Sequence, residues 1–230
     1  MTFSGLIPKP RIESLSDLIF GLALSIGALS LLSRPPVTPG DIVTGVIGFG
    51  FSFFILISVW LRYTALVTAL PRDVLETETS MSLNILLLFF VSIEPYLLSI
   101  ISFGPATVPA TVNRVLLEYA SQAYALDLTG LTGILGLLAH VLVKKEELFK
   151  PESVGVYKLV RNTQFAGAAF FGLSVLPVFW SWTIQDTPMR FYLWYGILAV
   201  FWVTDLSIII PDLARRLEYH RRKRREGAKA

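Results

Sequence analysis

Cysteine is absent from this 230-residue chain, and histidine occurs only twice. The absence of cysteine excludes structural disulfides, thiolate nucleophiles and cysteine metal sites. His140 and His220 lie far apart in the chain, so we expect no multi-histidine metal site within one subunit. Charged residues make up only 16% of the chain and hydrophobic residues 53%, a composition too apolar for a soluble domain of this size. The sequence therefore predicts an all-α integral membrane protein.

Enzyme motifs are missing as well. The chain has no glycine-rich phosphate loop, no paired-histidine zinc helix and no serine nucleophile elbow, so we expect neither an enzyme nor a bound cofactor or metal. It also lacks the threonine-valine-glycine-tyrosine-glycine filter and the re-entrant loop of ordinary potassium channels. If the protein is a channel, its selectivity must arise in another way.

Six apolar segments follow one another, separated by proline-rich or polar connectors. The expected membrane spans are residues 15–33, 41–68, 83–103, 123–143, 163–182 and 190–210. A basic tail, residues 211–230, follows them. At about 1.5 Å per residue the second segment is longer than a hydrocarbon core of roughly 30 Å, so we expect its Arg62 end to emerge into the interface.

Positive charge is distributed unevenly between the two ends of these spans. Of the 20 lysines and arginines, only Arg34, Arg114 and Arg190 fall on the side opposite the N-terminus. Because cytoplasmic loops carry the excess of lysine and arginine, both termini are predicted to be cytoplasmic, in a multi-pass protein of the cell membrane. Lys9 and Arg11 resemble the start of a secretory signal, but no small-residue cleavage pattern follows, so we expect this segment to be retained.

The basic tail has two interpretations. Its clusters of arginine and lysine are suited to binding nucleic acid, but an anionic lipid leaflet would lie directly beside them. We favour a role in topology or in contact with anionic lipid, and we expect no nucleic-acid partner.

Polar residues stand at the entrance of the first apolar segment. Arg11, Ser16 and Asp17 precede a nearly uncharged run from Leu18 to Leu32. Charges at the edge of the hydrocarbon layer are costly unless they have partners, which indicates fixed contacts between helices. Six helical steps of roughly 100° place Arg11 and Asp17 about 120° apart, so we expect each to reach a different helix.

The apolar part of the same segment has two faces. At roughly 100° per residue, Leu22, Ile26 and Leu29 lie on one stripe with Ser25 beside it. Small residues make the other face: Ser16, Ala23, Gly27 and Ser30. Small residues let helix backbones approach closely in lipid, so this second face is expected to pack against neighbouring helices. The bulky stripe is then left for lipid, for ordinary packing or for a central axis, and helical periodicity does not separate these alternatives.

Three carboxylates in or near the spans support a second function. Glu94, Asp127 and Asp205 are of the type used in proton-coupled transport, and Pro95 beside Glu94 is compatible with a broken helix. Against a transporter, the six segments show no obvious inverted repeat, and Asp127 and Asp205 are expected near the interfaces. A non-conducting membrane scaffold that uses the basic tail is a third alternative.

Several stretches together resemble a known family. Arg11-x-x-x-Leu15-Ser16-Asp17 is similar to the arginine, three spacers, phenylalanine-serine-aspartate signature of the transmembrane protein 175 family, which includes the lysosomal potassium channel and its prokaryotic relatives. Residues 83–91, followed by Pro95, resemble the third helix of that family. Trp60 and Tyr63 fall where its second helix carries tryptophan and histidine. The resemblance covers the first three spans well and the last three mainly in number and length.

The resemblance implies a potassium-permeable cation channel without a carbonyl selectivity filter. In that family four six-helix subunits surround one axis, and the first helices line the pore. The apolar ring five residues after the aspartate forms the constriction, which corresponds to Leu22 here, with Ile26 and Leu29 as further rings and Ser25 as a neighbouring hydroxyl. The implied assembly is a homotetramer that binds potassium only in transit.

The sequence departs from the family at positions that bear on the first helix. Leu15 replaces the signature phenylalanine, Leu22 stands where the human channel has isoleucine, and Tyr63 replaces the usual histidine. Because that histidine is missing, Trp60, Tyr63 and Asn84 are our candidates for the partners of Arg11, Ser16 and Asp17. We interpret these six residues as a structural network that holds the pore helix, and simple topology anchoring is the alternative.

Overall fold

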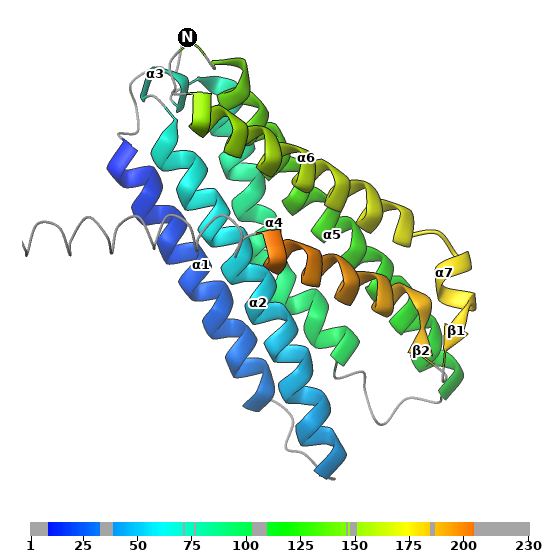
Figure 1. Ribbon diagram of the computed structural model, residues 1–230. Helices are drawn as coiled ribbons and strands as arrows, with labels where there is room; N and C mark the ends of the chain where they lie inside the picture. Colours follow the sequence, from blue (N-terminus) through cyan, green and yellow to red (C-terminus); the bar gives the residue numbers. More distant parts are fainter. Residues whose placement is uncertain are drawn as a thin grey trace, which may run out of the picture.

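Long helices account for nearly all of the chain that the computed structural model describes (Figure 1). The described residues are 9–32, 39–70, 72–75, 77–102, 110–145, 147, 151–184 and 187–204. Within them, five long helices are α1 (Lys9–Leu32), α2 (Pro39–Ala69), α4 (Glu78–Ser102), α5 (Ala110–Lys144) and α6 (Pro151–Ser174). Two single-turn helices are α3 (Arg72–Leu75) and α7 (Val178–Ser181). A two-stranded antiparallel hairpin, β1 (Thr183–Ile184) with β2 (Thr187–Pro188), precedes a C-terminal helix, Met189–Thr204.

Four of the helices are long and apolar enough to cross a membrane. Their apolar stretches are Ile12–Leu29, Gly45–Ala69, Glu78–Ile101 and Arg114–Lys144. In lipid every backbone polar group must be satisfied internally, and a helix does so within a single segment. The predicted all-α membrane class is therefore confirmed.

The fifth expected segment differs from the helix found, whereas the sixth begins within one residue of the C-terminal helix, Met189–Thr204. Helix α6 begins at Pro151 rather than at residue 163, so residues 151–162, which we predicted to be a polar connector, are helical. Proline is favoured at the first position of a helix because its missing N–H needs no partner there. The same helix ends at Ser174, shortly before Pro177, rather than at residue 182. The C-terminal helix is described as far as Thr204, and residues 205–230 lie outside the described part.

Helix α5 is the centre of the bundle. It packs against both α4 and α6, and one face of it is completely buried, including Leu131, Leu135, Leu138 and Leu142. Helix α1 lies at the edge, where it contacts α2 and α4 (Figure 1). The C-terminal helix, orange in Figure 1, returns from the hairpin toward α2. Ring contacts of Phe54 with Trp202 and of Phe51 with Tyr195 hold it there.

A buried arginine fastens the start of the C-terminal helix. Arg190 is fully buried and donates hydrogen bonds to the carbonyl oxygens of Ser174, at 2.6 Å, and Val175, at 3.2 Å. It also donates to Ser121 Oγ of α5 at 2.5 Å. The last carbonyls of a helix have no partner within that helix, so this guanidinium supplies the missing donors at the end of α6. Arg190 is thus a structural residue that joins α5, α6 and the C-terminal helix.

Two glycines of α6 give a matched test of this packing. A Cβ at Gly167 would overlap the ring of buried Phe201, whereas a Cβ at Gly155 would meet nothing within 4 Å. Overpacking a core typically costs about 1–3 kcal/mol, so Gly167→Ala is expected to lower the free energy of unfolding by about that amount. Alanine is the better helix former, so Gly155→Ala is expected to raise stability slightly, by up to about 1 kcal/mol. Unfolding in detergent measures both, and equal effects of the two substitutions would contradict the packing described.

Candidate functional site

Helix α1 has one face that packs against its own subunit. The buried positions recur every three or four residues and are Ile12, Ser16, Phe20, Ala23 and Gly27. Gly27 brings α1 close to its neighbours, because a Cβ there would lie 3.7 Å from the ring of Phe49 on α2 and 3.9 Å from Pro95 Cβ on α4. The sequence placed Ser16, Ala23 and Gly27 on this packing face, and the structure agrees. The side chain of Ser30 lies outside the described residues.

Two hydrogen bonds join the beginning of α1 to α2. The hydroxyl groups of Ser16 and Tyr63 are 2.8 Å apart, and both residues are buried. Trp60 Nε1 donates to Asp17 Oδ1 at 2.9 Å. Ser16 Oγ also lies 2.8 Å from the carbonyl oxygen of Ile12 in its own helix. We refer to Ser16, Asp17, Trp60 and Tyr63 as the polar lock. Tyrosine thus occupies the place of the expected histidine and supplies a hydroxyl group to Ser16.

The other two residues of the predicted network are not joined to the polar lock by a described contact. The side chain of Arg11 lies outside the described residues. Asn84 is buried, 3% exposed, and neither its amide nitrogen nor its amide oxygen has a hydrogen-bond partner among the described residues. A buried polar group without a hydrogen-bond partner costs free energy, so the amide group of Asn84 requires such a partner. The participation of Arg11 and Asn84 stays a prediction.

The bulky stripe of α1 faces away from its own subunit. Leu22 is 57% exposed, Ile26 43% and Leu29 60%, and Ser25 beside them is also exposed. Ser25 donates its hydroxyl hydrogen to the carbonyl oxygen of Gly21 at 2.8 Å, which leaves the lone pairs of its oxygen free to face outward. In a membrane such a stripe is covered by acyl chains or by another copy of the chain.

A second polar cluster lies in the interior of the bundle. Of its residues, only Glu94 was singled out from the sequence. Glu94 of α4 is completely buried and accepts hydrogen bonds from Tyr124 at 2.8 Å and from Ser52. Ser52 Oγ lies 2.9 Å from Oε1 and 2.6 Å from Oε2 of Glu94. Nothing in the sequence pattern identified these two partners, because each lies on a different helix from Glu94 and far from it in the chain.

Asp127 is buried in the middle of α5, and its depth in the membrane stays a prediction. It is 2% exposed, and neither carboxylate oxygen has a hydrogen-bond partner among the residues that the structure describes. Helix α5 begins at Ala110, well before the expected span, so Asp127 falls in the middle of that helix rather than near its end. Asp205, the third candidate carboxylate, lies outside the described residues.

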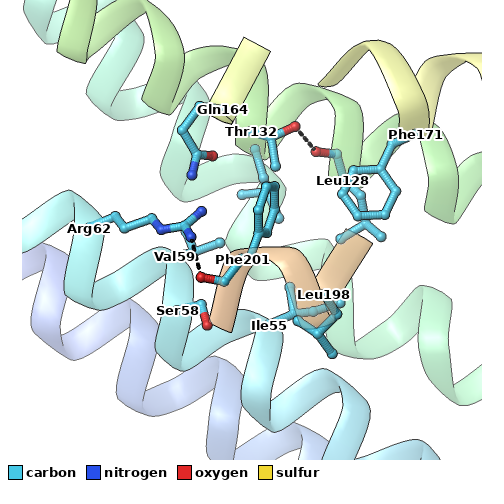
Figure 2. A pocket seen from close by; sticks show the side chains of 11 residues that line it. Ile55, Ser58, Val59, Arg62, Leu128, Thr132, Gln164, Phe171, Leu198 and Phe201 are labelled. Carbon is cyan, nitrogen blue, oxygen red and sulfur yellow. Dashed lines mark hydrogen bonds between the residues drawn. The ribbon is translucent and has the colours of Figure 1, made fainter. Parts of the chain in front are cut away.

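A small cavity of about 20 Å³ lies between α2, α5, α6 and the C-terminal helix (Figure 2). Arg62 lies at one side of it with its guanidinium carbon 4.4 Å from the centre of the Phe201 ring, and Arg62 Nη2 donates to the Phe201 carbonyl oxygen at 3.2 Å. Arg62 is thus buried within the subunit, and its expected position at the membrane interface stays a prediction. Because the space corresponds to about one water molecule, this cavity is too small for an organic substrate.

Comparisons with known proteins identify the fold of this chain. No family model and no curated protein sequence matches it. Among solved structures it is similar to one described as the crystal structure of a lysosomal potassium-selective channel TMEM175 homolog from Chamaesiphon minutus. The TM-score is 0.59 at 14% sequence identity, and the similarity covers 86% of this chain and 97% of the other. The chain therefore has the fold of that channel.

Substitution of Ser16 and of Ser25, both on α1, tests the polar lock. Ser16→Ala removes the hydrogen bond to Tyr63 and leaves the tyrosine hydroxyl buried, so we expect the free energy of unfolding to fall by about 1 kcal/mol. Ser25→Ala is the matched control, because that hydroxyl is exposed and bonds only within its own helix, and we expect a change within about 0.5 kcal/mol. Both are measured by unfolding in detergent. Equal losses from the two variants would show that the contact with Tyr63 does not stabilise the bundle.

Proposed function

We propose that this protein is the subunit of a potassium-permeable cation channel in which four copies of α1 line an axial pore. The observation that carries the proposal is the division of α1 into two faces. The polar lock and Gly27 hold one face against α2 and α4, so that Leu22, Ile26 and Leu29 project away from the subunit. The fold of the chain is similar to that of a protein described as a potassium-selective channel, which supports the proposal.

The proposed gate works by dewetting. Four copies of Leu22 that converge on an axis form a neck too narrow and too apolar to hold water, so a cation must shed part of its hydration shell to pass. Potassium is hydrated less strongly than sodium and loses less in doing so. The exposed Ser25 hydroxyl, close to this neck on α1, supplies an oxygen that offsets part of the dehydration. Selectivity then arises without a ring of backbone carbonyls.

The orientation and the surroundings of the channel follow from charge. The excess of lysine and arginine on the side of the N-terminus supports cytoplasmic termini in a cell membrane. The basic tail then lies beside anionic lipid headgroups, which is the partner we propose for it in place of nucleic acid. The mechanism requires no cofactor and no resident metal, only the permeant potassium ion.

A proton-coupled transporter is the second candidate, and buried Glu94 and Asp127 are the observations that favour it. The two functions differ in what drives potassium across a membrane. A channel in liposomes passes potassium down its own gradient, whereas a coupled transporter gives a flux that saturates and follows an imposed pH gradient. A scaffold gives no flux in either assay.

Leu22→Ala tests the gate. The smaller side chain widens the neck, so we expect sodium leak into liposomes to rise relative to potassium flux. An exposed leucine of α6, Leu173, provides the matched control, and Leu173→Ala is expected to leave the ratio of the two fluxes unchanged. The ratio is measured with ion-sensitive dyes in reconstituted vesicles. An unchanged ratio for Leu22→Ala would remove this residue from the gate.

The absence of cysteine allows a direct test of the assembly. Leu22→Cys places a single thiol where α1 helices are proposed to meet, and disulfides form when Cα atoms approach to about 4.4–6.8 Å. We expect oxidation in the membrane to give covalent dimers of Leu22→Cys, and none of Leu173→Cys on the outer face of α6. Native mass spectrometry of the unmodified protein is expected to give four subunits. A monomer that does not cross-link would contradict an axial pore.

A further inference from the structure

The cluster around Glu94 has a geometry that the pore does not explain. Ser52 of α2 and Tyr124 of α5 both donate to the same carboxyl group, so three helices meet at one buried acid. Among the described residues, no lysine, arginine or histidine lies within ion-pair distance of Glu94. A buried negative charge without a cationic partner is expensive in a membrane, where the surrounding medium does not solvate it.

Asp127 is the second observation. It lies one turn along α5 from Tyr124, and residues three apart in a helix occupy the same face. It is close enough to Glu94 to interact with it electrostatically, yet both of its oxygens are buried without a hydrogen-bond partner among the described residues. Tyr195 of the C-terminal helix lies near Tyr124, and from α2 the hydrogen bond to Glu94 that is described comes from the Ser52 hydroxyl. The groups that face Glu94 are therefore hydroxyls and a second acid, and none of them brings a positive charge.

The missing positive charge has to be small. The oxygen atoms around Glu94 are separated by 2.6–2.9 Å, which are hydrogen-bond distances. A metal cation bound by the same oxygens would need its own bonds of roughly 2.3–2.6 Å to each of about six oxygens, more than this cluster provides. A proton needs no such space, and protonation of either acid removes the repulsion between the two.

The cluster is connected to α1. Glu94 is followed directly by Pro95, and Ser52 lies one turn beyond Phe49 on α2. Phe49 and Pro95 supply the atoms nearest to a Cβ at Gly27 of α1. The hydrogen bonds between Ser52 and Glu94 therefore join α2 to α4 at the level where both of these helices press on α1. Separation of the two helices there would loosen the hold on Gly27, which is adjacent to Ile26 of the stripe.

We propose that Glu94 and Asp127, with Ser52 and Tyr124, form a proton-binding site inside each subunit, and that its occupancy controls how tightly α2 and α4 hold α1 at Gly27. The ligand is the proton itself, and the readout is the rate of cation flux. The coupling to flux rests on the proposed channel function, whereas the proton site does not.

The first test compares potassium flux in liposomes with equal pH on both sides, from about pH 5 to about pH 9, a range that extends to the highest values documented for buried acids. Couplings between two sites are typically about fivefold or more, so the wild-type rate is expected to change by at least about fivefold across this range. Glu94→Gln keeps the size and the hydrogen bonds but has no proton to release, so its rate is expected to be independent of pH and equal to the wild-type rate in acid. Glu78→Gln, an exposed acid in the first turn of the same helix, is the matched control and is expected to follow the wild type.

A second variant and a second readout complete the test. Asp127→Asn removes the neighbouring charge, so the pH midpoint of the flux is expected to move to lower pH. Infrared spectroscopy of the wild type is expected to show a carboxylic-acid band that disappears as the pH rises and that is lost in Glu94→Gln. A wild-type flux that ignores pH, a pH response that survives Glu94→Gln, or an unmoved midpoint in Asp127→Asn would overturn the regulatory proposal. Absence of flux at every pH would overturn the channel instead, and an infrared band that neither titrates nor responds to Glu94→Gln would overturn the proton site.

Discussion

The hydrogen bonds between α1 and α2 determine which face of α1 is turned outward. In lipid, acyl chains are as apolar as leucine, so burial of aliphatic side chains does not by itself select one rotation of a helix about its axis. Directional contacts do. Ser16 meets Tyr63 and Asp17 meets Trp60 only when the small residues of α1 face α2 and α4. The outward position of Leu22, Ile26 and Leu29 is a consequence of this rotation and not of any contact that those three residues make.

Helix α1 is held at two levels of different character. At Ser16 and Asp17 the hold consists of hydrogen bonds, which weaken steeply when distances or angles change. About 16 Å further along the helix axis, at Gly27, it consists of van der Waals contact with Phe49 and Pro95, which tolerates small sliding. Leu22 lies between the two levels. If α1 moves during gating, the polar lock is the more rigid point, and the displacement is larger toward the Gly27 end.

The faces of α1 could be predicted from sequence because they depend only on local geometry. A helix turns by roughly 100° per residue wherever it forms, so Ser16, Ala23 and Gly27 share a face in any fold that keeps the helix. The partners of Glu94 could not be predicted in this way. Ser52, Glu94 and Tyr124 lie on three different helices, and their meeting depends on how α2, α4 and α5 are rotated relative to one another. The burial of Asp127 could not be predicted for a related reason, because it depends on which face of α5 meets the neighbouring helices.

Exposure alone does not distinguish a pore face from a lipid face, and α4 makes this plain. Ile85 and Phe89 of α4 are 64% and 56% exposed, as much as the stripe of α1. The two helices differ in the contacts that their opposite, buried faces make. Behind the stripe of α1 lie the hydrogen bonds of the polar lock and a glycine contact, whereas the buried residues next to Ile85 and Phe89 along α4 are Leu87, Leu88 and Val91, together with Asn84, whose amide has no hydrogen-bond partner among the described residues. Apolar packing tolerates rearrangement, while hydrogen bonds to a hydroxyl and an indole require a fixed orientation. A membrane helix that needs only to face lipid has no use for such precision. The pore proposed for this chain requires each subunit to present the same side chain to an axis, and in that proposal the polar lock sets the orientation of α1.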